Sequence, residues 1–112
     1  MAPLSLNINN ERIEISILRN LIFNEDYTRK TLPFIKELYF NKRDEKILFQ
    51  EINSFVEKYK NLPTRESLLI ELSYRKDIND DEVKSVKELL STLHAEEVDQ
   101  QWLLDTTEKF CK

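Results

Sequence analysis

The chain has 112 residues and not one glycine. A chain of this length with ordinary composition would contain about eight glycines. The P-loop, the dinucleotide-binding turn, the nucleophile elbow and the kinase phosphate loop all depend on glycine. Two-residue β-hairpin turns also favour it, whereas a helix can end without it. The sequence therefore excludes these glycine-dependent sites from the chain and argues against a β-sheet protein.

Apolar residues recur at helical spacing along most of the chain, and no strand-like alternation competes with them. The clearest helix is predicted over residues 43–60, with an apolar stripe on one face and charged residues on the other. Its predicted inward positions are Leu48, Ile52, Phe55, Val56 and Tyr59, and its predicted charged face is Asp44, Glu45, Glu51, Glu57 and Lys58. We expect an all-α fold, a compact bundle of about six helices in one domain.

Helix boundaries are indicated by capping residues and prolines. Residues 1–9 are expected to be a flexible N-terminus, and the helical domain is expected to cover residues 10–112, beginning with Asn10 or Asn9 as a cap. Pro33 divides residues 25–40, the densest apolar and aromatic stretch, into two short helices. The other predicted caps are Thr64, Asp99, and Asn79 with Glu82 at capping-box spacing.

Charge and cysteine content exclude several classes of protein. There are 17 basic and 21 acidic residues, for a net charge of −4. The basic residues never cluster beyond pairs, so we do not expect strong binding to a nucleic-acid backbone. The one cysteine cannot form an internal disulfide, which is typical of a reducing compartment. No apolar run is long enough for a membrane span, and the N-terminus does not resemble a signal peptide.

No group of side chains predicts catalysis, a cofactor site or a metal site. His94 with Glu96 and Glu97 is a poor ligand set, because a metal needs three or four ligands at fixed geometry. Acidic pairs such as Asp80 and Asp81 lie at predicted helix starts, where they interact favourably with the positive end of the helix dipole. Cys111 has no histidine on its own element to act as a base. The residues therefore favour a non-catalytic helical module that binds a partner.

Several segments are familiar in their order and spacing. They are Ile15–Asn24 (ISILRNLIFN), Pro33–Phe40 (PFIKELYF), Tyr59–Thr64 (YKNLPT) and the late stretch Asp99–Phe110 (DQQWLLDTTEKF). Together they resemble the N-terminal domain of DnaB-type replicative DNA helicases, in particular the form found in T-even-like bacteriophages. The likeness covers about residues 13–112 and consists mostly of hydrophobic positions.

The resemblance implies a head or collar domain of a ring helicase. Such domains pair with neighbouring subunits of a hexamer and contact a primase or a helicase loader. The family's Walker A loop, arginine finger and DNA-binding loops lie in a separate C-terminal motor domain, and none has a matching position here. The resemblance thus implies a chain truncated before that domain and without enzymatic activity of its own. ATP and Mg would belong to the longer parent, an ATP-dependent DNA helicase in the cytoplasm of an infected bacterium.

A partner surface is predicted from basic pairs beside the aromatic stretch and from the apolar side of the last helix. The predicted residues are Arg29, Lys30, Lys42, Arg43, Trp102, Leu103 and Phe110. In isolation we expect a monomer or a weak dimer. Two alternatives stay open: a freestanding helical adaptor or regulator of protein–protein interactions, and a small nucleic-acid-binding protein. The acidic second half of the chain speaks against the latter.

Overall fold

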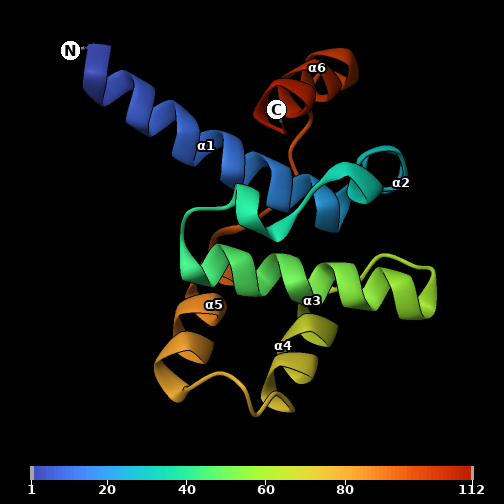
Figure 1. The fold of residues 1–112 in the computed structure, drawn as a ribbon. Helices are drawn as coiled ribbons and strands as arrows, with labels where there is room; N and C mark the ends of the chain where they lie inside the picture. The colour runs from blue at the N-terminus through green and yellow to red at the C-terminus, as the bar shows by residue number, and fades with distance from the viewer. Residues whose placement is uncertain (1, 112) are drawn as a thin grey trace.

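Helices make up all the regular structure in the computed structural model, which describes the backbone of residues 2–111 and the side chains of residues 13–111 (Figure 1). The α-helices are α1 (Ala2–Phe23), α2 (Glu25–Thr31), α3 (Arg43–Tyr59), α4 (Arg65–Ser73), α5 (Asp80–Thr92) and α6 (Gln100–Phe110). Two short 3₁₀ helices, η1 (Leu32–Phe34) and η2 (Glu37–Tyr39), connect α2 to α3. Among the described residues there is no strand, and the predicted all-α fold with about six helices is confirmed.

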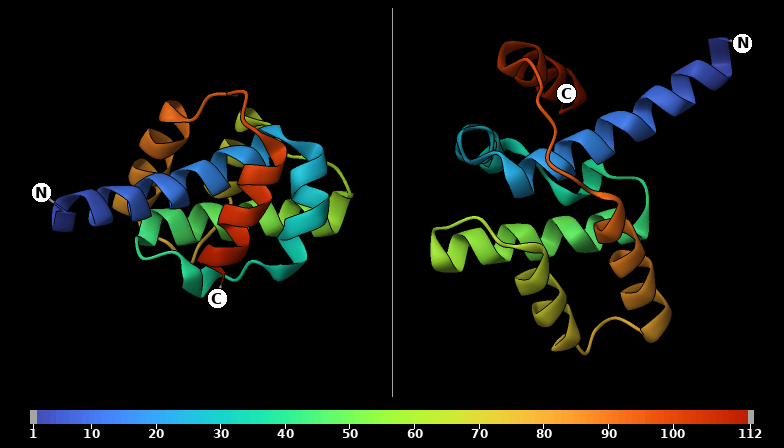
Figure 2. Two further views of the ribbon diagram at one scale, coloured as in Figure 1. Left: turned by 90° about the horizontal axis from the view of Figure 1, so that it is seen from above. Right: turned by 180° about the vertical axis from the view of Figure 1, so that it is seen from behind.

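The helices form three layers, and α3 is the middle layer. Figure 1 and the right view of Figure 2 show α1, α2 and α6 on one side of α3, and α4 and α5 on the other. The middle layer therefore packs against helices from both directions. This position explains why α3 has no fully solvated face in its first half.

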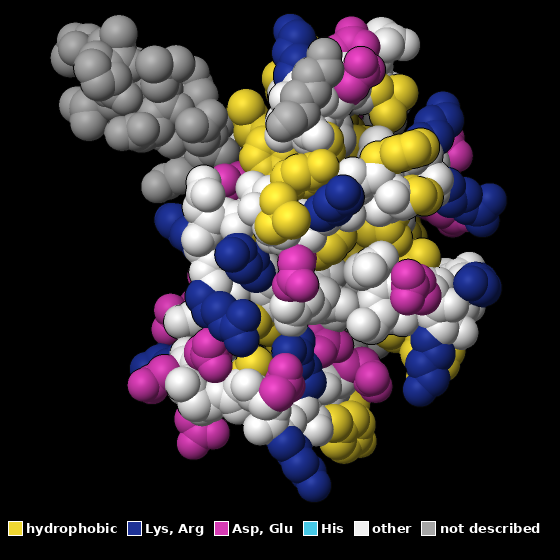
Figure 3. Space-filling model, viewed as in Figure 1, with side chains coloured by type: hydrophobic (Ala, Val, Ile, Leu, Met, Phe, Trp, Pro, Cys, Tyr) yellow, Lys and Arg dark blue, Asp and Glu magenta, His cyan; other side chains and the backbone are white. Residues whose placement is uncertain are grey.

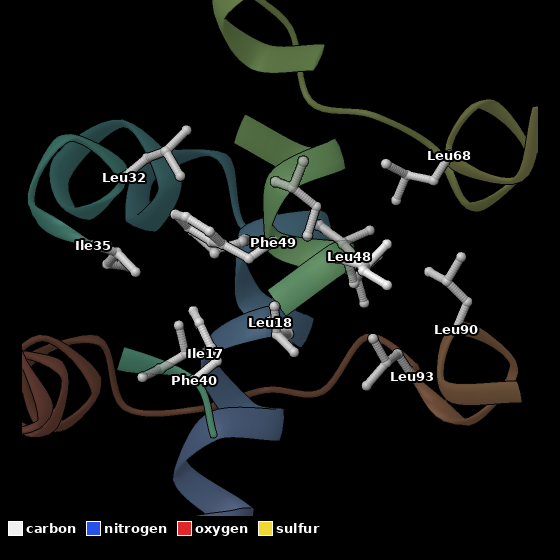
Figure 4. Packing of buried hydrophobic residues seen from close by; sticks show 14 of the residues in the cluster. Ile17, Leu18, Leu32, Ile35, Phe40, Leu48, Phe49, Leu68, Leu90 and Leu93 are labelled. Atoms are coloured by element: carbon white, nitrogen blue, oxygen red, sulfur yellow. The ribbon is translucent and has the colours of Figure 1, made fainter. Parts of the chain in front are cut away.

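The core is continuous through these layers. Four inward positions of α3, Ile47, Leu48, Phe49 and Ile52, are buried. In Figure 4, Phe49 points toward Leu32 whereas Leu48 points toward Leu90. The side chains of one helix thus join the outer layers into a single hydrophobic core.

The predicted helix caps are confirmed where the structure describes them. The side chains of Thr64, Asn79 and Asp99 each accept a hydrogen bond from the backbone N–H three residues further on. Asn79 and Glu82 form the predicted reciprocal capping box, with hydrogen bonds of 2.8 and 3.0 Å. Thr31 ends α2 and Pro33 lies in the first turn of η1, as the proline predicts.

The first helix differs from the expectation. The backbone of α1 is helical from Ala2, whereas the apolar pattern places its start near Asn10. Capping by Asn9 or Asn10 would involve side chains outside the described residues. The flexibility of residues 1–9 and the domain boundary at residue 10 stay predictions.

The predicted faces of α3 are wrong at two positions. Glu45 is buried rather than part of a charged surface, because α1 covers the helix on the side opposite α4 and α5. Tyr59 is exposed, although the apolar pattern predicts that it faces inward. Its neighbours Glu57 and Lys58 are exposed, as predicted. At the start of α3, residues on more than one face of the helix are therefore buried, whereas its last three residues are exposed.

Candidate partner-binding surface

The helix α6 crosses α1 and runs beside α2, as the view from above in Figure 2 shows. Its inner face is attached by a buried hydrogen bond of 2.7 Å between the hydroxyls of Tyr27 on α2 and Thr107. Burial raises the pKa of Tyr27 to about 12, although the bond to Thr107 acts in the opposite direction. The phenol therefore stays protonated at neutral pH. A second link joins Asn24 Nδ2 to Gln100 Oε1 at 3.2 Å.

The C-terminal end of α6 is held by aromatic contacts. The ring of Phe110 lies edge-on to Tyr39, with centroids 6.1 Å apart, and 5.9 Å from the ring of Phe40. Such aromatic pairs stabilise a fold by more than the burial of their surface area alone. The start of α6 is thus attached at the N-cap of α2, and its end is attached to the residues of η2 and its C-cap.

A groove of about 860 Å³ runs between α1 and α6. Its floor is apolar, with Ile13, Ile17 and Leu103 among the lining residues, and the Trp102 side chain stands at its edge with 53% of its surface exposed. Arg19 also lines the groove and pairs with Glu96 at 3.5 Å. An apolar floor with an exposed indole and a charged pair is typical of a protein-binding surface.

A second groove, of about 480 Å³, lies on the other flank of α6, against η1. Its apolar lining includes Phe34, Ile35 and Leu104, and Phe34 is 71% exposed. Lys30 and Glu108 add charge at its edge. Figure 3 shows the face of the molecule that is seen in Figure 1. On this face, apolar side chains gather in the upper part, whereas charged side chains predominate over α4 and α5. Part of the exposed apolar surface therefore lies beside α6, at Trp102 and Phe34, while other exposed apolar side chains such as Tyr74 lie near α4.

The predicted partner residues on α6 differ in how far they are exposed to solvent. Trp102 is exposed at the first groove, as a contact residue needs to be. Phe110 is half-buried between aromatic rings, and Leu103 is only 1% exposed. Leu103 therefore offers little surface to a partner, because the helical position next to Trp102 turns toward α1 and the core. Whether the set binds a partner stays a prediction.

The two predicted basic pairs lie beside different elements. On α2, Arg29 forms an ion pair with Glu25 one turn earlier, and Lys30 lines the second groove. At the start of α3, Arg43 forms an ion pair of 2.8 Å with Glu82 of α5. Lys30 is therefore the basic residue of this set that lies beside α6.

Sequence reasoning missed Phe34 as a surface residue, because it lies in the dense apolar stretch whose composition favours core packing. Ile35 and Phe40 from that stretch are buried, whereas Phe34 and Leu38 are exposed. The signal that distinguishes them is Pro33. It replaces a regular helix with 3₁₀ turns, so that the 3.6-residue spacing no longer tells which side chains face the core.

The described residues include those that the sequence offers as candidates for metal binding or nucleophilic chemistry. Among residues 13–111 there is no group of three His, Cys, Asp or Glu side chains that could hold a metal ion. Burial raises the pKa of the Cys111 thiol, which keeps it in the less nucleophilic form. None of the described helices has the length and hydropathy needed to span a membrane.

Comparison with known proteins gives an informative similarity. No protein-family model matches the chain. The chain is similar to the DnaB-like replicative helicase of Enterobacteria phage T4, with 33% identity over 94 residues. The aligned region covers 84% of this chain and 20% of the phage protein. The chain thus spans about a fifth of the length of its relative, and the similarity supports a helicase-related domain.

Proposed function

We propose that the chain is a non-catalytic assembly and partner-binding domain of a phage-type replicative DNA helicase, and that it corresponds to the N-terminal domain of that protein. The observation that supports this most is the similarity to the T4 helicase, which extends over most of the chain. A similarity of that extent concerns a whole folded domain rather than a short motif.

The structure supports the binding role through the two grooves beside α6. Both have apolar linings, and both place an exposed aromatic ring, Trp102 or Phe34, at their edge. Aromatic side chains on such surfaces often contribute most of the affinity of an interface. In the proposal, a primase or a helicase loader occupies one or both grooves.

The motor function belongs, in this proposal, to a part of the protein outside this sequence. ATP hydrolysis by a helicase of this kind needs a phosphate loop with glycine, and the chain has no glycine. ATP and Mg would therefore bind elsewhere in the parent, as would most of the DNA. The parent would assemble into a hexamer and unwind duplex DNA at the replication fork.

The proposal is tested by measuring calorimetrically the affinity of the chain for the purified primase and helicase loader of the same genome. We expect Trp102→Ala or Phe34→Ala to weaken binding of at least one of them by about tenfold or more, which corresponds to about 1.4 kcal/mol. Tyr74→Ala is the matched control, because Tyr74 is an exposed aromatic residue on the α4 side, away from both grooves. It should leave the affinity unchanged.

Two outcomes would contradict the proposal. One is that neither protein binds, or that both groove variants bind like the wild type. The other is ATP turnover by the purified chain that DNA stimulates, because the proposal assigns no catalysis to this domain.

A further inference from the structure

Two glutamates face each other in the interface between α1 and α3. Glu14 lies in α1 and Glu45 in the first turn of α3, and each is only 2% exposed. Glu14 is among the groups that raise the pKa of Glu45, so the two carboxyls lie close together. Asn41, just before α3, donates from Nδ2 to Glu14 Oε1 at 3.1 Å. We call Glu14 and Glu45 the carboxyl pair.

A carboxyl–carboxyl hydrogen bond requires a proton on one of the two groups. Glu45 is the group of the pair that holds a proton more readily, since burial raises its pKa to about 8 and the neighbouring Glu14 acts in the same direction. A protonated Glu45 can donate a hydrogen bond to Glu14 without adding a second negative charge to the site. The second oxygen of Glu45, Oε1, is buried and has no hydrogen-bond partner among the described residues.

Among the described residues, the other charged groups that affect Glu45 give little compensation for a negative charge there. Asp44 is adjacent and raises the pKa of Glu45, while Lys42 lowers it and is the smallest of the contributions. The backbone N–H of Glu45 is already bonded to Asp44 Oδ1 at 2.8 Å. Loss of the proton would therefore leave two carboxylates in contact in a site with little water, which is strongly unfavourable.

We propose that the carboxyl pair is a proton-dependent contact that holds α1 against α3 and weakens the attachment of α1 when its proton is lost. This inference does not rest on the proposed function. It concerns the same helix, however, because α1 forms one wall of the groove beside Trp102. Alkaline conditions would thus loosen a wall of that groove.

The direction of the pH dependence follows from the raised pKa. Between the ordinary value of 4.5 and about 8, the folded chain binds more protons at this site than the unfolded chain. The folding equilibrium constant should therefore fall as pH rises through this range, by up to about tenfold per pH unit from this group. The change should level off above about pH 8.

The experiment uses the 112-residue chain and two variants, Glu45→Gln and Glu57→Gln. In the first variant the glutamine side chain keeps the shape of the glutamate and can donate to Glu14 without titrating. Glu57 lies on the same helix but is exposed, so Glu57→Gln is the matched control. Urea denaturation from pH 5 to 9 should show a stability that declines with pH in the wild type and in Glu57→Gln but is much flatter in Glu45→Gln. Equal pH dependence in all three proteins would overturn the proposal.

Two further measurements separate the contact from a general effect on stability. The side-chain carboxyl ¹³C signal of Glu45 should titrate well above its ordinary range, and Glu14→Gln should lower its midpoint. At pH 8.5, amide protection in α1 should be about tenfold or more lower in the wild type than in Glu45→Gln, while α5 should differ less. An ordinary midpoint for Glu45, or equal protection of α1 in both proteins, would refute the proposal.

Discussion

At the scale of single residues, one hydrogen bond connects α2 to the last helix, α6. The hydroxyls of Tyr27 and Thr107 are 80 positions apart in sequence and 2.7 Å apart in space, and both side chains are buried. A buried hydroxyl without a partner is costly, so each of the two residues depends on the other. The bond fixes the register of α6 on α2.

We expect Tyr27→Phe to lower the free energy of unfolding by about 1–2 kcal/mol, because Thr107 Oγ1 would lose its partner without gaining water. Urea denaturation monitored by circular dichroism measures the change. Tyr74→Phe removes the same hydroxyl from an exposed ring and should have almost no effect. The double variant Tyr27→Phe, Thr107→Val should cost less than the sum of its parts, and strict additivity would show that the bond contributes nothing.

At the scale of the secondary-structure elements, α3 ends in a way that normally calls for glycine. Its C-cap, Lys60, has a φ of 58° and the left-handed conformation, the only positive φ among the described residues. The Lys60 N–H donates to the carbonyl of Val56 at 2.9 Å. A residue with a Cβ is strained in this conformation, so the glycine-free composition has a local energetic cost here.

Lys60→Gly should therefore stabilise the chain by about 0.5–1 kcal/mol, even though it removes a side chain. Lys58→Gly provides the contrast, because Lys58 is exposed but lies within the last turn of α3, where glycine costs about 0.5–1 kcal/mol. Thermal and urea denaturation of both variants measure the difference. A loss of stability in Lys60→Gly would mean that the lysine side chain matters more than the backbone conformation.

Element boundaries could be predicted well because caps and prolines act locally. Thr64, Asn79 and Asp99 fulfil their roles within one turn of the chain, without help from the tertiary fold. Burial on α3 could be predicted only in part. An amphipathic pattern assumes one buried face, and Glu45 is buried because helices pack on both sides of α3. That arrangement is not visible in the local sequence.

At the scale of the whole molecule, the free energy of unfolding should depend on the buried side chains of α3, the helix of the middle layer. Ile52 on α3 is fully buried and belongs to the continuous core that joins the outer layers. A cavity at this position removes contacts in the region that both layers share.

Ile52→Ala should lower the free energy of unfolding by about 2–5 kcal/mol, a large part of the roughly 5–15 kcal/mol that is common for a domain. Urea denaturation should show one transition at a lower midpoint, with a similar slope. Ile70→Ala makes the same change at an exposed position of α4 and should cost far less. Two separate transitions in Ile52→Ala would contradict a single cooperative core.

The fold class was accessible from the sequence, whereas the shape of the surface was not. Helical periodicity predicts about how many helices form and most of the residues they contain, although not the start of α1. The grooves beside α6 depend on how far apart α1, η1 and α6 settle, and that distance is set by packing among residues remote in sequence. Trp102 and Leu103 show the limit: they are neighbours in the chain, yet one is exposed and the other buried.

The place of Trp102 has a practical consequence. It is the chain's single tryptophan, and it stands at the edge of the groove between α1 and α6 with about half of its surface in solvent. Its fluorescence therefore comes from one known position, and any ligand that fills the groove displaces water from the ring. The protein contains its own optical reporter for occupancy of that groove, and no dye or label has to be attached.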